Sequence, residues 1–190
     1  MPPPAGASPH PQPGPQLLDA GAIAARVDEL AAAIAATALD AGHGPLLLVC
    51  VLKGSFVFTA DLARRLAARG VPVEIEFVAV RSYAGEASAG SVELVCDVAT
   101  SLRERDVLLV EDVVDTGLTT AFLAEHCGAR RPHRLRLAAL LDKPGRRRRA
   151  VDIDFCGFSI GDEFVVGYGL DVDERWRELP GVHTLAGGTG

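Results

Sequence analysis

Short apolar runs alternate with longer stretches of helical pattern, and this alternation limits the fold more than any other feature. The strand candidates occupy residues 46–52, 73–80, 107–112, 135–142 and 164–170. Apolar runs of this length are typical of strands buried on both faces of a sheet. Helical patterns fill residues 19–42, with Asp19 as the expected N-cap, and residues 55–70 and 118–129. The order predicts an α/β fold with a mainly parallel twisted sheet flanked by helices.

The chain has room for one domain with a full core, since it contains 190 residues. Residues 1–16, MPPPAGASPHPQPGPQ, are rich in proline and lack the apolar core of a signal peptide. We expect them to be a disordered tail, and we expect residues 186–190, AGGTG, to be a flexible one. The folded domain is therefore predicted at residues 17–185.

Charge and cysteine spacing exclude several classes of protein. The formal net charge of −6 argues against nucleic acid as a main partner, and no apolar run is long enough to span a bilayer. The four cysteines lie far apart without Cys-x-x-Cys spacing, which argues against a zinc site and fits a cytoplasmic location. The basic run at residues 146–149, RRRR, is predicted to be a solvated loop, with an anion site as the alternative.

Polar clusters follow four of the predicted strands. They are Lys53-Gly54, residues 81–83, residues 111–120 and Asp142-Lys143. In an open α/β sheet, ligands bind beyond the carboxyl ends of the strands. The four clusters are therefore expected to converge on one site.

The cluster VLLVEDVVDTGLTT, residues 107–120, combines the signs of two kinds of ligand. Backbone N–H groups at the start of a helix, with the hydroxyls of Thr116, Thr119 and Thr120, would hold a phosphate, and Gly117 allows close approach. The spacing is not that of a Walker loop. The carboxylates of residues 111, 112 and 115 would instead accept hydrogen bonds from a sugar diol or hold Mg²⁺. A sugar phosphate would suit both the phosphate-binding part and the acidic part of this cluster. The alternative is that the acids have no ligand and only stabilise the N-terminus of the helix.

This cluster resembles the phosphoribosyl-diphosphate motif of type I phosphoribosyltransferases. Further segments, LKGSFVFTADLARR, SYAGEASAG, LLDKP and EFVVGYGLD…RWRELP, resemble the hypoxanthine(-guanine) branch and occur in its order. The resemblance runs from about Leu46 to Pro180. It implies the type I fold with a small hood for the purine, and transfer of phosphoribose from phosphoribosyl diphosphate to a 6-oxopurine in purine salvage.

The resemblance implies a role for each matching residue on the sugar-phosphate side. Lys53 and Gly54 would form the diphosphate loop, in which this family often has a cis peptide before the lysine. Glu111 and Asp112 would hold the ribose hydroxyls, and Arg177 would contact diphosphate. The 5′-phosphate would be wrapped by the loop of Asp115, Thr116, Gly117, Leu118, Thr119 and Thr120.

The same resemblance assigns the purine side and the metal. Asp115 would accept the N7 proton, Lys143 would donate to O6, Phe164 would stack on the base, and the Val165 backbone would read its edge. Asp171 would lie by the purine and ligate Mg²⁺, and the predicted metal ligands are Glu111, Asp112 and Asp171. From pattern alone, Lys143 would be a solvated turn residue, Phe164 a core residue and Arg177 part of a solvated face.

A lid that excludes water is implied for residues 81–90, with Ser82 and Tyr83 as its substrate contacts. The chain departs from the family here, since Ala84, Ala87 and Ala89 stand where glycine, serine or threonine is common. Cys96 likewise stands where lysine is frequent. These departures concern lid hydrogen bonds and closing rate rather than the class of reaction.

Other functions remain open from the sequence. A xanthine-preferring 6-oxopurine transferase would share the same pocket residues, and a non-catalytic nucleotide-sensing regulator would keep the same fold. The presence of Asp115, Lys143 and Asp171 argues against loss of catalysis, and Lys143 suits a carbonyl acceptor rather than the amino group of adenine. The family commonly forms homodimers or homotetramers, and the sequence does not choose between them.

Overall fold

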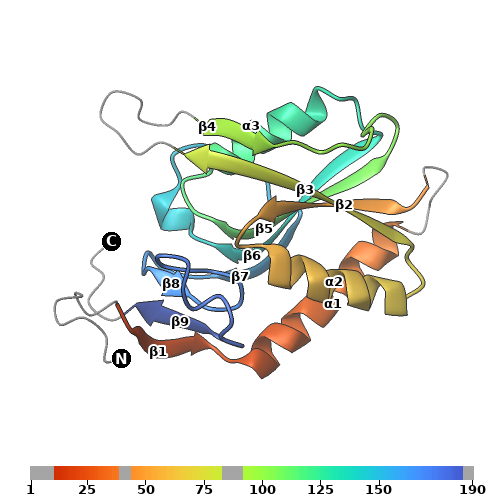
Figure 1. Cartoon of the computed structure of the whole chain (residues 1–190). Coiled ribbons are helices and arrows are strands. Elements are labelled where there is room, and N and C mark those ends of the chain that lie inside the picture. Colours follow the sequence, from red (N-terminus) through yellow and green to blue (C-terminus); the bar gives the residue numbers. More distant parts are fainter. Residues whose placement is uncertain (1–10, 39–43, 83–91, 186–190) are drawn as a thin grey trace, which may run out of the picture.

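The computed structural model describes residues 11–38, 44–82 and 92–185 (Figure 1). The predicted tail at residues 186–190 lies outside these segments, as do residues 1–10. Within them, no helix combines the length and the apolar character needed to cross a membrane.

Two sheets and three α-helices make up the described chain. In order along the sequence the elements are β1 (Pro13–Leu18), α1 (Ala20–Ala38), β2 (Leu46–Leu52), α2 (Phe56–Ala68), β3 (Val73–Ser82), β4 (Val92–Cys96), β5 (Asp106–Val114), α3 (Leu118–Gly128), β6 (Arg134–Asp142), a 3₁₀ turn (Pro144–Arg146), β7 (Phe155–Ser159), β8 (Val165–Val166) and β9 (Val182–Leu185).

The main sheet has six strands in the order β4-β3-β2-β5-β6-β7. Strands β3, β2, β5, β6 and β7 run parallel, and only the edge strand β4 is antiparallel. The mainly parallel α/β architecture is therefore confirmed. Because the strands run the same way, the segments that follow β2, β5 and β6 meet at one edge.

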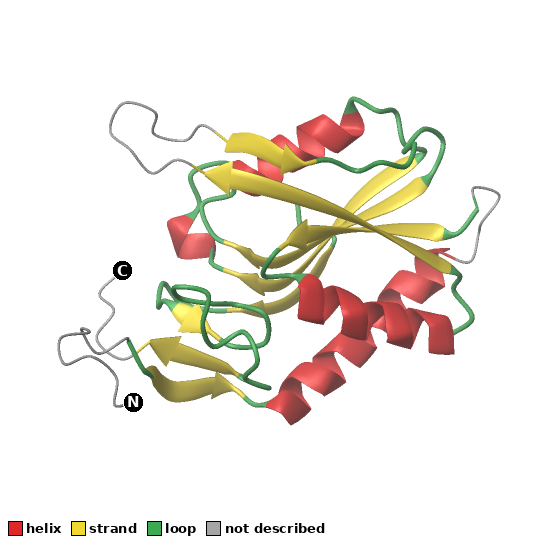
Figure 2. Cartoon of the chain, viewed as in Figure 1, coloured by secondary structure: helices red, strands yellow, loops and turns green. Residues whose placement is uncertain are grey.

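The sheet is buried because helices cover both of its faces. Helices α1 and α2 lie on one face and α3 lies on the other (Figure 2). Strand residues alternate between the two cores: Leu48 and Leu108 pack toward α1 and α2, while Leu47 and Leu109 pack on the α3 side. This two-sided burial explains why the central strands read as continuous apolar runs. Asp19 caps α1 as predicted, since its Oδ1 accepts the Ala22 N–H at 2.8 Å.

A small antiparallel sheet, ordered β1-β9-β8, lies beside the edge where the parallel strands end (Figure 1). Its first strand corrects the predicted tail at residues 1–16, because residues 13–16 belong to β1 and pair with β9. Two prolines fit in β1 because it is an edge strand, where a missing N–H faces away from the ladder. The register shifts twice along this pair, so its sequence lacks a regular alternation.

The prediction of a strand at residues 164–170 is wrong beyond its first part. Only Val165 and Val166 are extended, and they belong to the small sheet. Gly167, Tyr168 and Gly169 all have positive φ values, 100°, 51° and 101°, which extended chain does not adopt. The backbone turns here because Gly169 packs against the carbonyl of Gly54, leaving no room for a Cβ atom.

Strands β4 and β7 were not predicted. Each has only five residues and lies at an edge of the main sheet. Their short, half-exposed sequences, VELVC and FCGFS, carry neither a continuous apolar run nor a clear alternation. Pairing with β3 and β6, not a local pattern, places them.

Candidate active site

Two adjoining cavities lie where the parallel strands end. One, of about 210 Å³, is lined by Lys53, Gly54, Asp112, Val113, Asp115, Lys143, Phe164, Val165, Leu170, Asp171 and Arg177. The other, of about 250 Å³, is lined by Val51, Leu52, Lys53, Gly54, Val80, Glu111, Asp112, Val113, Thr119 and Thr120. Three of the four predicted clusters therefore contribute directly, and the site draws on β2, β5, β6 and the small sheet.

The loop after β2 brings its backbone against β5. The peptide bond between Leu52 and Lys53 is cis, as the resemblance implies. Gly54 packs so closely on the Asp112 carboxylate that a Cβ atom there would overlap it. Ser55 is buried, and its hydroxyl donates to the carbonyl of Val51 at 2.7 Å. The loop is thus fixed between β2 and β5 with Lys53 exposed beside the cavity.

Two acids at the end of β5 are costly to ionise because they are buried. Burial raises the pKa of Glu111 well above its usual range, and the neighbouring Asp112 adds to this. Burial also raises the pKa of Asp112, to about 6. The Thr120 hydroxyl donates to Glu111 at 3.3 Å. Such paired, perturbed carboxyl groups in a cleft are typical of functional sites.

The next residues turn from β5 into α3. Gly117 has a φ of 80° and no space for a Cβ atom, so glycine is required at this turn. Helix α3 begins at Leu118, and the first N–H groups of a helix lack intrahelical acceptors. Thr119 and Thr120 lie in this first turn and line the second cavity. The loop has the features of an anion-binding helix N-terminus.

Lys143, Phe164 and Asp115 line the first cavity together. Lys143 is buried, its Nζ donates to the carbonyl of Glu163 at 2.8 Å, and burial lowers its pKa. Phe164 keeps 44% of its surface exposed, so the core role that its apolar run suggests is wrong. An exposed aromatic ring beside a buried ammonium group and a carboxylate suits a flat, polar-edged ligand.

A charged network also borders this cavity, through Lys53, Asp171 and Arg177. Arg177 pairs with Asp171 at 2.8 Å and donates to the Gly169 carbonyl at 2.7 Å. Glu174 accepts from Lys53 at 2.9 Å and from Arg177 at 3.2 Å. Lys53 and Arg177, distant in sequence, are therefore held around one carboxylate, and the solvated-face alternative for Arg177 does not hold.

Some predicted contacts cannot be placed. Ser82 ends β3, but Tyr83 and the alanines of the predicted lid lie outside the described residues. Glu174 was not predicted as a site residue, because its charged segment was interpreted as a solvated face. The side chains that contact Asp115 from the arginine run were not predicted either. No local signal marks these contacts, since Arg146 and Asp115 are 31 residues apart.

The carboxylates fit Mg²⁺ only in part. Asp112 and Asp171 line the first cavity, whereas Glu111 lines the second. Across the described segments, no three histidine, cysteine or acidic side chains form a group arranged to bind a metal. Mg²⁺ is usually held by one or two carboxylates together with substrate phosphate oxygens. The donor set therefore fits an ion shared with a bound substrate, not one held by three protein ligands.

Comparison with known proteins places the chain in a family. Residues 14–173 match the family model described as "Phosphoribosyl transferase domain". The hypoxanthine-guanine phosphoribosyltransferase of Mycobacterium avium is 45% identical over 173 residues, covering 89% of this chain and 84% of that protein.

Solved structures agree with this placement. A hypoxanthine phosphoribosyltransferase of Trypanosoma cruzi in complex with the product IMP has a TM-score of 0.84 at 42% identity, covering 90% and 92% of the two chains. Another structure from T. cruzi, from work on the C-terminal region, oligomeric state and activity, has a TM-score of 0.87 at 39% identity, covering 94% and 93%. The chain therefore belongs to the phosphoribosyl transferase domain family, in its hypoxanthine(-guanine) phosphoribosyltransferase branch.

Proposed function

We propose that this chain transfers the 5-phosphoribosyl group from phosphoribosyl diphosphate to N9 of hypoxanthine, and also of guanine. The products are the nucleoside monophosphate and diphosphate, as in purine salvage. One observation carries the proposal: a single cavity is lined by a first group, Lys143, Phe164 and Asp115, and by a second group, Lys53 and Arg177. The first group suits a 6-oxopurine, and the second suits diphosphate. The names of the relatives agree with both.

At the purine end, each side chain has a separate task. Lys143 keeps donors free beyond its bond to Glu163 and directs one to O6 of the base. Phe164 offers its exposed ring for stacking. The backbone of Val165 reads the edge of the base. Asp115 lines the same cavity and accepts the proton from N7.

At the sugar end, Glu111 and Asp112 accept hydrogen bonds from the ribose hydroxyls. The turn from Asp115 to Thr120 holds the 5′-phosphate on the N-terminus of α3. Lys53, Gly54 and Arg177 bind the diphosphate. Lys53 and Arg177 now donate hydrogen bonds to Glu174, and bonds to the diphosphate replace these when it binds. Ser82 and Tyr83 remain predicted contacts of the lid.

The chemistry follows from these positions. As the bond between C1 of ribose and the diphosphate breaks, N9 of the purine bonds to C1 with inversion, and the N7 proton passes to Asp115. The sugar becomes positively charged on the way, as in glycoside transfer, and the nearby carboxylates favour that charge. Mg²⁺, bound through Asp112 and Asp171 together with substrate oxygens, would neutralise charge on the leaving diphosphate.

The assembly and location of the protein are also proposals. We expect a homodimer or a homotetramer in the cytoplasm, without nucleic acid or membrane as partners. The T. cruzi structure from work on the oligomeric state of that protein supports an assembly of some order. The net charge of −6 supports the absence of a nucleic-acid role.

A rate comparison tests the function. Hypoxanthine, guanine, xanthine and adenine are each supplied with phosphoribosyl diphosphate and Mg²⁺, and nucleotide formation is measured. We expect hypoxanthine and guanine to react well and adenine not at all, because Lys143 donates to a carbonyl. Faster reaction with xanthine would replace the proposal by a xanthine-preferring enzyme. No turnover with any base would favour a nucleotide-sensing regulator.

A further inference from the structure

The arginine run at residues 146–149 is folded against the proposed phosphate loop and is not merely solvated. Arg146 and Arg147 are only partly exposed, at 37% and 18% of their side-chain surfaces. The side chain of Arg148 is exposed. We call residues 146–149 the arginine clamp. The predicted solvated loop therefore holds for the Arg148 side chain and is wrong for Arg146 and Arg147.

The clamp contacts the loop at the Asp115 side chain and at two backbone carbonyls. Nε of Arg146 donates to the Asp115 carboxylate at 2.8 Å. Nη1 of Arg147 donates to the backbone carbonyl of Asp115 at 2.7 Å, while its Nη2 pairs with Asp142 at the end of β6. The backbone N–H groups of residues 148 and 149 both donate to the carbonyl of Thr116, at 2.9 and 3.0 Å. Two successive loop carbonyls are thereby satisfied.

These contacts decide which way the loop presents its N–H groups. In a trans peptide the carbonyl oxygen and the amide hydrogen point to opposite sides. Since the carbonyls of Asp115 and Thr116 face the clamp, the N–H groups of Thr116 and Gly117 face away from it. An anion bound at the start of α3 needs such free, aligned donors.

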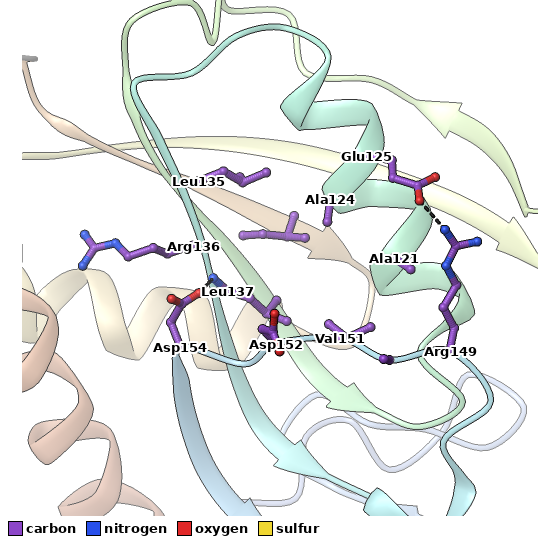
Figure 3. A pocket seen from close by; sticks show the side chains of 12 residues that line it. Ala121, Ala124, Glu125, Leu135, Arg136, Leu137, Arg149, Val151, Asp152 and Asp154 are labelled. Atoms are coloured by element: carbon purple, nitrogen blue, oxygen red, sulfur yellow. Dashed lines mark hydrogen bonds and ion pairs between the residues drawn. The ribbon is translucent and has the colours of Figure 1, made fainter.

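The clamp is itself anchored on both sides. Arg147 connects it to β6 through Asp142, and Arg149 reaches Glu125 on α3 (Figure 3). The carbonyl of Arg149 lies so near Gly117 that a Cβ atom on the glycine would overlap it. Beyond it, residues 149–152 and Asp154 border a cavity of about 450 Å³ between α3 and β6. The loop is thus held between α3 and a segment fixed to β6.

We propose that the arginine clamp positions the phosphate loop for the transfer reaction, and that its two partly buried arginines have different tasks. Arg146 orients the carboxylate of Asp115, and Arg147 fixes the backbone that presents N–H groups to the 5′-phosphate. Both are positioning residues, since they act through Asp115 and the loop. The role in catalysis rests on the proposed function; the role in ordering the loop does not.

The two tasks predict different kinetic defects. Arg147→Gln should weaken binding of inosine monophosphate about tenfold, the equivalent of one charge-assisted hydrogen bond, and binding of inosine by less than about twofold. Arg146→Gln should lower kcat at least about tenfold while inosine monophosphate binds within about threefold of wild type. Arg146→Lys should recover part of kcat. Arg147→Lys should recover less, since one ammonium group replaces a fork that reaches two acceptors.

Arg148→Gln is the matched control within the run. It removes one arginine charge but keeps the backbone N–H, so kinetics and binding should stay within about twofold of wild type. Equal defects in all three glutamine variants would show a general effect of charge and overturn the proposal. Equal loss of inosine and inosine monophosphate binding in Arg147→Gln would also overturn it.

Hydrogen–deuterium exchange of the unliganded protein separates this proposal from the proposed function. The peptide that covers residues 114–122 should exchange at least about tenfold faster in Arg147→Gln than in wild type or Arg148→Gln. Arg147→Lys should show a smaller increase in the exchange rate. Faster exchange in Arg147→Gln, found together with a wild-type protein that lacks transferase activity, would leave the clamp standing and refute the function. If the wild-type enzyme is active but Arg147→Gln shows unchanged exchange in this peptide and unchanged affinity for inosine monophosphate, the clamp proposal is refuted.

Discussion

Gly54 lies directly against the carboxylate of Asp112, with no room between them for a Cβ atom. The contact joins the loop after β2 to the end of β5. The proposed diphosphate site and the proposed ribose site are therefore in direct contact at this point. An added methyl group must displace either the loop that carries Lys53 or the carboxylate itself. Either shift moves groups that need to be placed within a fraction of an ångström.

The first prediction is therefore that Gly54→Ala lowers kcat/KM for phosphoribosyl diphosphate at least about a hundredfold, the scale expected for a misplacement near 1 Å. Steady-state kinetics with hypoxanthine would measure this. Gly128→Ala is the control, because the nearest atom to its added Cβ would be 4.0 Å away. Near-normal kinetics in Gly54→Ala would mean that the loop can move without harm.

The second prediction concerns how the Asp112 carboxyl group affects the stability of the protein. Burial raises the pKa of Asp112 to about 6 in the folded protein, above an unfolded value of about 3.9. The folded state therefore holds this proton more tightly, and stability falls as pH rises from about 4 to about 6. Asp112→Asn should be more stable than wild type at pH 7.5, by about 1 kcal/mol after allowance for partial exposure, or about 2–4 °C in Tm.

Denaturant unfolding between pH 4 and 8, without metal or substrate, would check the sign. The gap between Asp112→Asn and wild type should close as pH falls toward 4. Asp152→Asn, at an exposed position, controls for the change in net charge. A gap that widens toward low pH would contradict the prediction, because it would mean that the folded state favours the ionised carboxylate.

The third prediction follows from Glu174, which binds the two cations proposed to hold diphosphate. Its carboxylate competes with the diphosphate for Lys53 and Arg177. Glu174→Gln should therefore tighten diphosphate binding and lower KM for phosphoribosyl diphosphate, by about two- to fivefold given the exposure of this group. Calorimetry with diphosphate would measure it, with Glu178→Gln as the control for charge. Weaker binding would mean that Glu174 positions the two cations instead.

The sequence predicted the central strands better than it predicted the edges of the sheets. Central strands are buried on both faces, so their apolar runs are visible without any knowledge of neighbours, and the polar residues that end them mark the site edge. Strand β1, with two prolines, forms only because β9 lies beside it. Phe164 was ambiguous because an apolar run does not reveal which of its members the fold leaves exposed.

The contacts of the arginine clamp were not predictable for a related reason. A run of four arginines reads as solvated, because such charges are usually left in water. Their acceptors, Asp115 and the Thr116 carbonyl, lie in the loop that follows β5, and only the parallel pairing of β5 with β6 brings them near. The exposed side chain of Arg148 shows that the general rule still holds within the same run.

The fourth prediction concerns Lys143, the buried donor beside Asp115. Lys143→Ala should reduce use of hypoxanthine about ten- to a hundredfold in kcat/KM, since a hydrogen bond to a charged group is lost. Affinity for phosphoribosyl diphosphate should change much less, because that substrate does not reach the ammonium group. Kinetics with each substrate varied in turn would separate the two effects. A normal KM and kcat for the base would leave Lys143 with a structural role through Glu163 alone.

The last prediction separates proton transfer from binding at Asp115. Asp115→Asn keeps the size of the side chain but removes the proton acceptor, while the N–H groups of the loop remain. Turnover should fall by about 10²–10⁴-fold, the usual contribution of a positioned general base, with inosine monophosphate bound within about tenfold of wild type. Glu111→Gln and Asp112→Asn should instead weaken phosphoribosyl diphosphate binding together with rate, because their proposed partners are the ribose hydroxyls.

Steady-state kinetics with hypoxanthine and calorimetry with inosine monophosphate on these three variants make the comparison. The Arg146 contact sharpens it, because an asparagine amide can still accept from Arg146 through its oxygen, so the orientation of the side chain is preserved. A loss of rate in Asp115→Asn is then a loss of basicity rather than of placement. If affinity and turnover fall in equal proportion, Asp115 binds the nucleotide or shapes the loop, and the N7 proton must leave through water or the diphosphate.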